Sequence, residues 1–222
     1  MTNILITGGG SGLGAEIVKA IEESDPTSNV VVFDGDVRGP EIWELPSNID
    51  ILINCAGVNK INWLENVSDE EWNEIIDVNA GGIFRMVRAC LPQLANSKGT
   101  VLNIVSNAAH MPMTCSAAYN ASKAAALILT KQMARELFPK HGITVFSVSP
   151  NKLSGTPMSR SIDEQVCRTR GWTMDHAQQY QLNGLSVKKE TPPKRVAEFI
   201  AFLLSSKERH FYLNGCDLPY GL

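Results

Sequence analysis

The sequence has little that would suit an oxidising compartment, a membrane or a nucleic acid. Its five cysteines are scattered through 222 residues without a CxxC pair, which predicts reduced thiols and no disulfide framework. No apolar run approaches the roughly 18 residues that span a bilayer, and no secretory leader is recognisable. Charged residues make up only 19%, and the net charge of −3 offers no basic surface. These shortages predict a cytoplasmic protein that binds neither nucleic acid nor membrane.

The sequence also has few histidines and few features that would mark a domain boundary. The four histidines, His110, His141, His176 and His210, lie far apart and have no metal-ligand spacing, so we expect no metal site. No internal repeat, low-complexity tract or linker divides the chain. We therefore expect one domain over residues 1–222.

Short, nearly continuous apolar runs alternate with longer amphipathic stretches, as in a parallel sheet covered on both faces. The expected strands are 3–7, 29–34, 50–54, 100–106 and 143–149. The expected helices are 12–24, 68–95, 115–138 and 194–206, the second one capped by Ser68 and Glu71. This alternation predicts an α/β fold with a Rossmann-like, doubly wound parallel sheet flanked by helices.

Residues 151–190 depart from the pattern, with weak periodicity and many Ser, Thr and Gln residues. They follow the end of a strand, at the edge where open α/β sheets bind ligands. Long segments in that position are usually active-site lids or disordered loops. We expect a substrate lid.

The first strand runs directly into a glycine-rich turn and then a helix. Gly8, Gly12 and Gly14 have the spacing G-x-x-x-G-x-G, and Ser11 and Leu13 lie between them. A helix N-terminus directs free N–H groups and partial positive charge at one point, which suits a phosphate. Glycine lets the phosphate approach the backbone, so the turn predicts dinucleotide binding.

An acid closes the second strand in the place that such a site requires. Asp34 lies twenty residues after Gly14, near the spacing of a carboxylate that binds the adenosine ribose 2′-OH. That carboxylate would repel a 2′-phosphate, and Ser11 carries no compensating charge. The sequence therefore favours NAD over NADP, although the nearby Arg38 argues for NADP.

A second signal follows the fourth strand. Tyr119 and Lys123 are four residues apart and share one face of a helix, and Ser106 lies at the end of the strand before them. Hydride transfer between an alcohol and NAD also moves a proton at the substrate oxygen. A neighbouring ammonium and a positive nicotinamide favour the phenolate, so Tyr119 is the expected general acid/base. Ser106 would hydrogen-bond the substrate oxygen, and Lys123 would also hold ribose hydroxyls.

With these residues the sequence resembles the short-chain dehydrogenase/reductase family, of the single-domain type. The resemblance covers essentially the whole chain. Its motifs are TGGGSGLG (7–14), NCAG (54–57), DVNAGG (77–82), YNASK (119–123), SPNKLSGTPM (149–158) and LNGCDLPYGL (213–222).

The resemblance implies an oxidoreductase that acts on a secondary alcohol or ketone. It implies a catalytic tetrad of Asn79, Ser106, Tyr119 and Lys123, with Asn79 at a helix kink. The cofactor residues implied are Gly8, Ser11, Gly12, Leu13, Gly14, Asp34, Asn54, Ala56, Gly57, Tyr119, Lys123, Pro150 and Thr156. It also suggests His110 and Met158 as substrate contacts, and a homotetramer or homodimer built on the two long helices and the tail.

The chain departs from the family between Asp34 and Asp50, where about sixteen residues replace a helix, a strand and a second helix. We therefore expect six strands, with the family's third strand missing from the sheet edge. The loss removes the family's acidic contact to adenine, which Asp36 and Val37 would replace. The remaining residues allow at most a helical turn around Trp43.

Two other functions are compatible with the sequence. A dinucleotide-binding protein with a regulatory or structural role would tolerate a shortened adenine side, although the intact tetrad argues against it. An epimerase or dehydratase that keeps its cofactor bound would carry different glycine spacing. The substrate and the direction of the reaction are not readable from the sequence.

Overall fold

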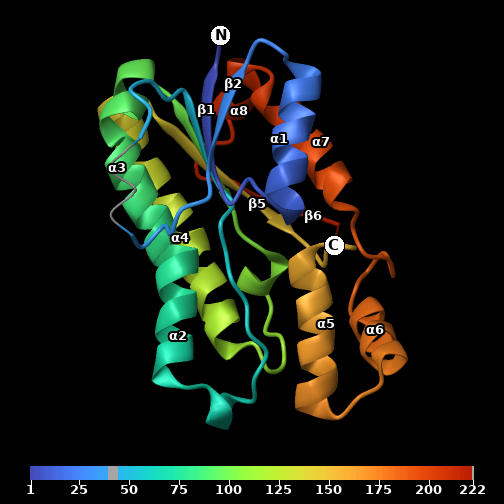
Figure 1. Cartoon of the computed structure of the whole chain (residues 1–222). Helices are drawn as coiled ribbons and strands as arrows, with labels where there is room; N and C mark the ends of the chain where they lie inside the picture. Colours follow the sequence, from blue (N-terminus) through green and yellow to red (C-terminus); the bar gives the residue numbers. More distant parts are fainter. Residues whose placement is uncertain (40–44, 222) are drawn as a thin grey trace.

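The computed structural model describes residues 1–39 and 45–221, which form three layers, with helices on both faces of a parallel sheet (Figure 1). The strand order is β2-β1-β3-β4-β5-β6. The strands are β1 Asn3–Thr7, β2 Asn29–Phe33, β3 Ile51–Asn54, β4 Thr100–Ile104, β5 Thr144–Pro150 and β6 Asp217–Tyr220. The predicted fold class is confirmed, and β6 comes from the tail.

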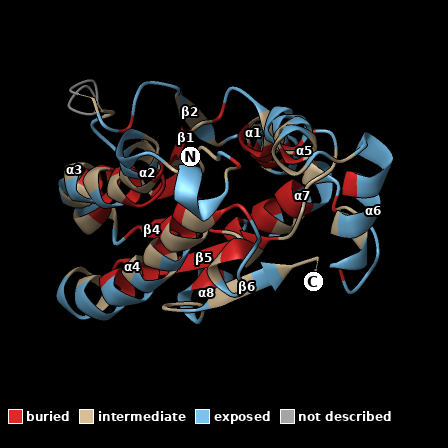
Figure 2. Ribbon diagram, turned by 90° about the horizontal axis from the view of Figure 1, so that it is seen from below, coloured by how far each residue is buried: buried red, intermediate tan, exposed pale blue. Residues whose placement is uncertain are grey.

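The helices separate into two layers, and their inner sides are buried (Figure 2). They are α1 Gly12–Ser24, α2 Asp69–Ile76, α3 Gly82–Ser97, α4 Ala117–His141, α5 Pro157–Arg170, α6 Met174–Asn183, α7 Pro193–Leu204 and α8 Lys207–Phe211. Shorter turns are η2 Leu64–Asn66, η3 Asp77–Gly81 and η4 Asn107–Ala109. One core lies under α1 and α7, and the other lies under α3 and α4.

Both faces of the sheet are apolar because each strand sends alternate side chains to opposite cores. Ile4 and Ile6 of β1 pack towards α1 and α7, whereas Leu5 between them packs towards α3 and α4. This two-sided burial is why the strands read as continuous apolar runs. The order of the strands reverses at β1, which has β2 on one side and β3 on the other. The crevice beyond their carboxyl ends is where open α/β sheets bind ligands.

The shortened segment leaves β2 at the edge of the sheet. Within the described ranges no strand pairs with the outer side of β2, which fits the loss of the family's third strand. Val37 is buried, and its side chain packs against the backbone of Gly82 at the start of α3. The chain therefore crosses directly from β2 towards α3. The helical turn expected around Trp43 lies outside the described residues.

The helix expected over 68–95 is interrupted. Ser68 caps α2 as expected, because its hydroxyl accepts the Glu71 amide at 3.2 Å. The π-helical turn η3 then separates α2 from α3. An inserted residue of this kind widens the helix and is common at functional sites. Periodicity alone did not reveal it, since the apolar positions continue across the turn.

Residues 151–190 contain two helices, which the weak apolar periodicity did not predict. The Thr156 hydroxyl caps α5 by accepting the Ser159 amide at 3.0 Å, and Thr173 caps α6 in the same way. Half-buried Lys152 binds Asp163 of α5 and Glu190 ahead of α7, at 2.5 and 3.2 Å. Caps and ion pairs, which hydropathy does not register, therefore define this segment.

Candidate active site

The glycine turn between β1 and α1 is so tight that side chains are excluded from it. Gly8 has a φ of +67°, and a Cβ on it would lie 2.9 Å from the Ala56 Cα. A Cβ on Gly14 would lie 2.0 Å from the Gly8 carbonyl oxygen. The backbone amides at the start of α1 are thus open to a phosphate, and the turn fits the pyrophosphate of a dinucleotide. Leu13 points into the core, which leaves only its backbone for such a ligand.

Asp34 lies beside this turn. Its Oδ1 accepts the Gly10 amide at 3.0 Å, and its carboxylate fills the space that a Gly10 side chain would need. The exposed carboxylate therefore borders the phosphate turn, where the sequence places a ribose contact. Arg38, four residues on, donates from Nε and Nη2 to the carboxylate of Asp36, at 2.8–3.1 Å.

The segment after β3 is fixed to β1. The Thr7 hydroxyl accepts the amides of Cys55 and Ala56, both at 3.1 Å. The Asn54 side chain turns into the sheet and donates to Asn103 Oδ1 at 2.8 Å. Asn54 therefore joins β3 to β4. The backbone of Ala56 lies against Gly8 of the glycine turn, and a Cβ on Gly57 would approach Asn79 and Lys123.

Asn79 is fully buried in the π-helical turn. Its Oδ1 accepts the Val58 amide at 2.8 Å, and its Nδ2 donates to the Val58 carbonyl and to Ser122 Oγ, both at 2.9 Å. Ser122 in turn donates to the Tyr119 carbonyl at 2.8 Å. The carboxamide thus ties the loop after β3 to α4, and the widened turn leaves room for it.

Tyr119, Lys123 and Ser106 meet at the carboxyl edge of the sheet. Lys123 is buried, donates from Nζ to the Ile104 carbonyl at 3.0 Å, and lies 5.8 Å from the centre of the Tyr119 ring. The Ser106 hydroxyl accepts the Ala108 amide at 3.1 Å and is close enough to the Tyr119 phenol to lower its pKa. Three residues from η4 and α4 therefore lie together, and their roles remain predictions from the sequence.

Burial dominates the titration of this group. It raises the pKa of Tyr119 above 10.0, and the neighbouring Ser106 hydroxyl opposes the rise. It also lowers the pKa of Lys123 to about 8 and raises the pKa of the Cys55 thiol to about 11. The free protein therefore holds a neutral phenol, a neutral thiol and a mostly protonated amine near pH 7. The lowering of the Tyr119 pKa expected from its neighbours requires a further positive charge.

The other site residues predicted from the sequence are Pro150, Thr156, Met158 and His110. Pro150 ends β5, and Thr156 lies over the glycine turn, where a Cβ on Gly12 would be 3.8 Å from its own Cβ. Met158 is exposed on the first turn of α5. His110 donates or accepts through Nε2 at 2.8 Å from Asp217 on β6, so its ring is engaged within the protein.

Two residues in this region were missed in the sequence. Asn120 directly follows Tyr119, and its side chain bonds to the backbone after Ser106. Asp217 is buried and accepts from the hydroxyls of Ser147 and Ser149. Asn has a poor helix propensity, so its place in the first turns of a helix is the available signal for Asn120. Asp217 had no local signal, because its partners are distant in sequence.

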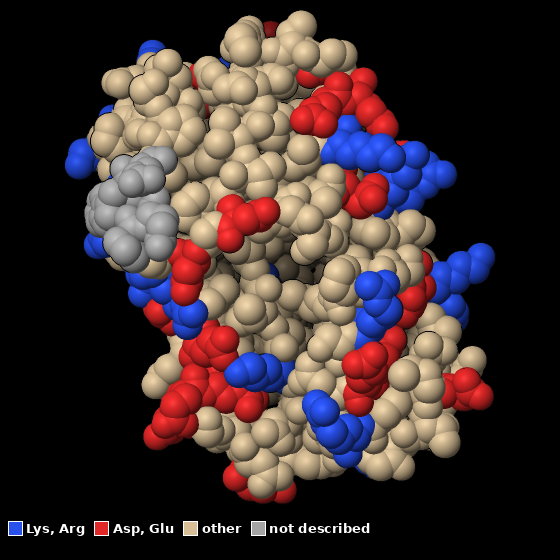
Figure 3. All heavy atoms as spheres, in the orientation of Figure 1, with Lys and Arg blue, Asp and Glu red and all other residues tan. Residues whose placement is uncertain are grey.

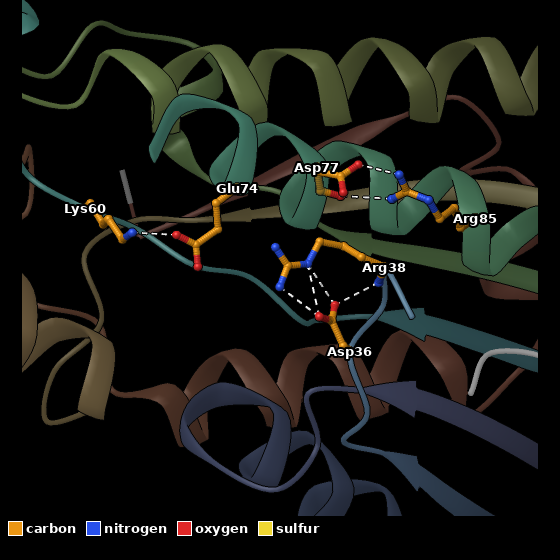
Figure 4. Close-up of polar contacts among 6 residues, drawn as sticks. All are labelled: Asp36, Arg38, Lys60, Glu74, Asp77 and Arg85. Atoms are coloured by element: carbon orange, nitrogen blue, oxygen red, sulfur yellow. Dashed lines mark hydrogen bonds and ion pairs between the residues drawn. The ribbon is translucent and has the colours of Figure 1, made fainter. Parts of the chain in front are cut away.

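A cavity of about 530 Å³ opens beside the Asp36–Arg38 turn, away from Tyr119. Its walls are charged, and ion pairs join Asp36 to Arg38, Glu74 to Lys60 and Asp77 to Arg85 (Figure 4). The lining residues are Arg38, Glu70, Asn73, Glu74, Ile76, Asp77 and Gly81. The same face is hollowed near its centre in the space-filling view, with charged side chains around the hollow (Figure 3).

Within the residues that the structure covers, no three His, Cys, Asp or Glu side chains cluster as metal ligands would. No described helix has both the length and the apolar character needed to cross a bilayer.

Comparison with known proteins adds independent evidence. Residues 40–166 match the family model described as short chain dehydrogenase. The 2,3-dihydro-2,3-dihydroxybenzoate dehydrogenase of Bacillus subtilis is 32% identical over 180 residues, covering 78% of this chain and 66% of that protein. The chain thus spans just under two thirds of that relative. The 3-oxoacyl-[acyl-carrier-protein] reductase FabG of Staphylococcus epidermidis is 27% identical over 216 residues, covering 94% of this chain and 83% of that protein.

Solved structures resemble the whole fold. A variant of actinorhodin polyketide ketoreductase, crystallised with NADPH, has a TM-score of 0.89 at 24% identity and covers 98% of this chain and 95% of its own. Levodione reductase has a TM-score of 0.85 at 22% identity, covering 99% of this chain and 96% of its own. At these identities the likeness concerns the fold.

Proposed function

The chain belongs to the short-chain dehydrogenase family of oxidoreductases, and from that premise we propose that it transfers hydride between a nicotinamide dinucleotide and a secondary alcohol or ketone. The observation that carries the proposal is the buried pair Tyr119 and Lys123, with half-buried Ser106 beside them, at the sheet edge that also holds the glycine turn. A proton donor and a dinucleotide site are the two components that this reaction needs.

In the proposed mechanism the chain handles the proton. During oxidation the Tyr119 phenolate removes the proton from the substrate hydroxyl, and during reduction the phenol returns it to the carbonyl oxygen. A nicotinamide dinucleotide held at the glycine turn would supply the hydride chemistry at the substrate carbon. Ser106 hydrogen-bonds the substrate oxygen as charge develops there. Lys123 favours the phenolate by its charge, and Asn79 holds α4 and the loop after β3 in register.

The pKa of Tyr119 must change between the free and the loaded protein. Burial raises it in the free protein, so the phenol stays protonated there. The ammonium of Lys123 and a positive nicotinamide both favour the phenolate. These two cations act on a desolvated phenol, where they oppose the rise caused by burial.

Asp34 and Arg38 together support a preference for NAD. The carboxylate of Asp34 is exposed beside the phosphate turn, suited to a ribose 2′-OH and repulsive to a 2′-phosphate. Arg38, which in the sequence argued for NADP, has its guanidinium bound to Asp36 at 2.8–3.1 Å. The cation that a 2′-phosphate would need is thus already engaged.

Asp34→Asn tests this preference. We expect the dissociation constant for NADH to rise by about tenfold, since a charge-assisted hydrogen bond is lost. We expect the constant for NADPH to fall by a similar factor, because the repulsion disappears. Calorimetric titration of both proteins with each dinucleotide measures the change. Tighter binding of NADPH than NADH by the unaltered protein would reject the preference.

The Asp36–Arg38 turn is proposed to replace the adenine contact of the missing segment. Arg38 lowers the pKa of Asp36 to about 2, so the carboxylate is charged at neutral pH. Its bonds to Arg38 hold the turn in place, with Val37 buried against Gly82. The turn therefore closes the side of the crevice on which the adenosine would lie.

Asp36→Ala tests whether the turn contacts the cofactor or whether Asp36 is only a solvated surface acid. We expect NADH to bind about fivefold to tenfold more weakly, and NADPH to gain relative to NADH because Arg38 is released. Asp25→Ala is the matched control, a half-buried acid whose pKa is also lowered but which lies at the opposite end of β2. Unchanged NADH affinity in Asp36→Ala would show that the turn does not contact the cofactor.

We further propose that α5 and α6 act as the substrate lid and that the protein works as a homotetramer or homodimer in the cytoplasm. The lid starts over the glycine turn through Thr156. Exposed Phe84 on α3 and Ile128 on α4 offer apolar surface for a second copy. All five cysteines are free thiols, which suits a reducing compartment.

A further inference from the structure

The segment between Ser106 and Tyr119, here called the 107–116 loop, connects the two residues proposed to bind the substrate oxygen. It begins with the turn η4 and continues without regular structure to the start of α4. Any displacement of this loop therefore alters the wall of the site next to the reacting atoms. What holds it in place bears directly on which substrates fit.

Asn120 holds the first half of the loop. Its Nδ2 donates to the carbonyls of Ala108 and Met111, both at 2.7 Å. Its Oδ1 accepts the Met113 amide at 3.2 Å. One carboxamide thus satisfies three backbone groups, out of the four hydrogen bonds that it can form. Because Asn120 follows Tyr119, one turn of α4 positions both the phenol and the loop.

Other elements hold the rest of the loop. His110 contacts buried Asp217 on β6 at 2.8 Å. The Thr114 carbonyl accepts from Arg170 of α5 at 2.7 Å, and the Cys115 carbonyl accepts the Asn62 amide at 2.9 Å. These contacts leave the Met113 amide and the Met111 carbonyl to Asn120. The backbone of that stretch would lose its side-chain anchor if the carboxamide were removed.

Residues 111–113 include two methionines. Met111 and Met113 are both exposed, and the Met111 sulfur accepts from the Asn107 side chain at 3.0 Å, next to Ser106. Met158 is exposed on the first turn of α5. Thioethers are apolar and adapt their shape to a ligand.

Charged groups around the site are committed to protein partners. Lys152 pairs with Asp163 and Glu190, and Arg170 donates to Thr114 while stacking on Trp172. His110 is engaged by Asp217. A charged substrate would have to break one of these contacts, whereas an apolar one would not.

We propose that Asn120 is a positioning residue that sets substrate specificity, by fixing Met111 and Met113 beside Ser106 as an apolar wall for an uncharged, apolar ketone or alcohol. The inference rests on the proposed function, and it names the substrate class of the same site. Asn120 acts through the loop and does not itself touch the reacting atoms.

Asn120→Ala removes the anchor, and Asn120→Asp keeps the acceptor for Met113 but directs a carboxylate oxygen at two carbonyls. Gln132→Ala is the control, an exposed amide on the same helix that bonds only to Glu136. The probes are 1-tetralone, a bulky apolar ketone, and acetone. Calorimetry measures their binding to the NADH complex, steady-state assays measure KM and kcat, and hydrogen exchange follows the Met113 amide.

The unaltered protein is expected to bind 1-tetralone at least about tenfold more tightly than acetone. In Asn120→Ala, the KM and dissociation constant for 1-tetralone should rise about tenfold, with kcat and NADH affinity changed less than about threefold. The Met113 amide should exchange faster, and Asn120→Asp should be affected more strongly. Gln132→Ala should match the unaltered protein.

Equal binding of both ketones by the unaltered protein, or binding of neither, would overturn the apolar substrate class. Unchanged 1-tetralone affinity in a folded Asn120→Ala protein would overturn the positioning role, even if the Met113 amide exchanged faster. If Asn120→Asp does not fold, the Ala variant decides alone. Failure of the proposed function has a different signature, in which 1-tetralone binds but is never reduced with NADH or NADPH.

Discussion

Tyr119→Phe is expected to lower kcat by about a thousandfold while leaving the dissociation constant for NADH within about twofold. The phenol is buried and close to Lys123, and Ser106 lowers its pKa, so it is the group placed to exchange a proton with the substrate oxygen. Phenylalanine keeps the ring and its packing against Ala108 and Ala118. The loss should therefore appear in turnover and not in folding or cofactor binding.

The pH dependence of the unaltered enzyme is part of the same test. The oxidation rate should rise with pH as the Tyr119 pKa in the loaded protein is crossed, because the phenolate is the base. Tyr119→Phe should lack that rise. Steady-state rates from about pH 6 to pH 10 measure both.

Tyr212→Phe is the matched control, since it removes a phenol from an exposed tyrosine just after α8. It should behave like the unaltered protein. Normal turnover in Tyr119→Phe would reject the proton-transfer mechanism. A protein that bound NADH tightly but reduced nothing would instead favour the dinucleotide-binding role that the sequence left open.

The local motifs located five of the six strands and the glycine turn. Gly14 lies in the first turn of α1, and a Cβ there would meet the Gly8 carbonyl, so a backbone constraint fixed the residue type. Tyr119 and Lys123 share a helix face, so their contact follows from periodicity alone. In each case a short-range geometric rule links the sequence to the structure.

Contacts between distant elements were beyond the sequence. Asp217 reaches His110 and Ser147 only because β6 pairs with β5, a register that no local pattern specifies. The Asn54 side chain bonds to Asn103 on the next strand, a contact that its own motif does not reveal. A polar side chain goes where its partner lies, and partners are set by the tertiary fold.

The two helices within 151–190 illustrate a different limit. Their apolar positions form only a small cluster around Val166 and Ala177, too few to impose a helical period on the sequence. Thr156, Thr173 and the αL residue Gly171 mark the helix ends instead. Capping signals were present in the sequence, but without a periodic run beside them they carried little weight.

Lys123→Met should make the protein more stable at pH 7 and nearly inactive. Burial lowers the Lys123 pKa from 10.5 to about 8, so holding the ammonium in place costs stability wherever it is charged. A shift of that size corresponds to roughly 3 kcal/mol, and the lost bond to the Ile104 carbonyl takes back about 1 kcal/mol. We expect a net gain of about 2 kcal/mol in the free energy of unfolding and a fall in kcat of at least about a hundredfold.

The gain should depend on pH with a definite sign. Below about pH 8 the lysine is protonated in both the folded and the unfolded protein, so the full cost is present. Between the two pKa values the unfolded chain binds more protons, so the stability of the unaltered protein rises relative to the variant. Urea unfolding at pH 7 and at pH 10 should therefore show the difference shrinking. Lys131→Met, an exposed lysine on the same helix, should change stability by less than about 0.5 kcal/mol at either pH.

A gain of equal size at both pH values would mean that methionine simply packs better and that the buried charge is not the cause. A loss of stability at pH 7 would mean that the bond to Ile104 outweighs the desolvation of the ammonium. The expected result, a more stable and less active protein, would instead show that Lys123 lowers the stability of the fold and is needed for activity. Such a cost fits the proposed chemistry, because the charge of Lys123 beside Tyr119 favours the phenolate.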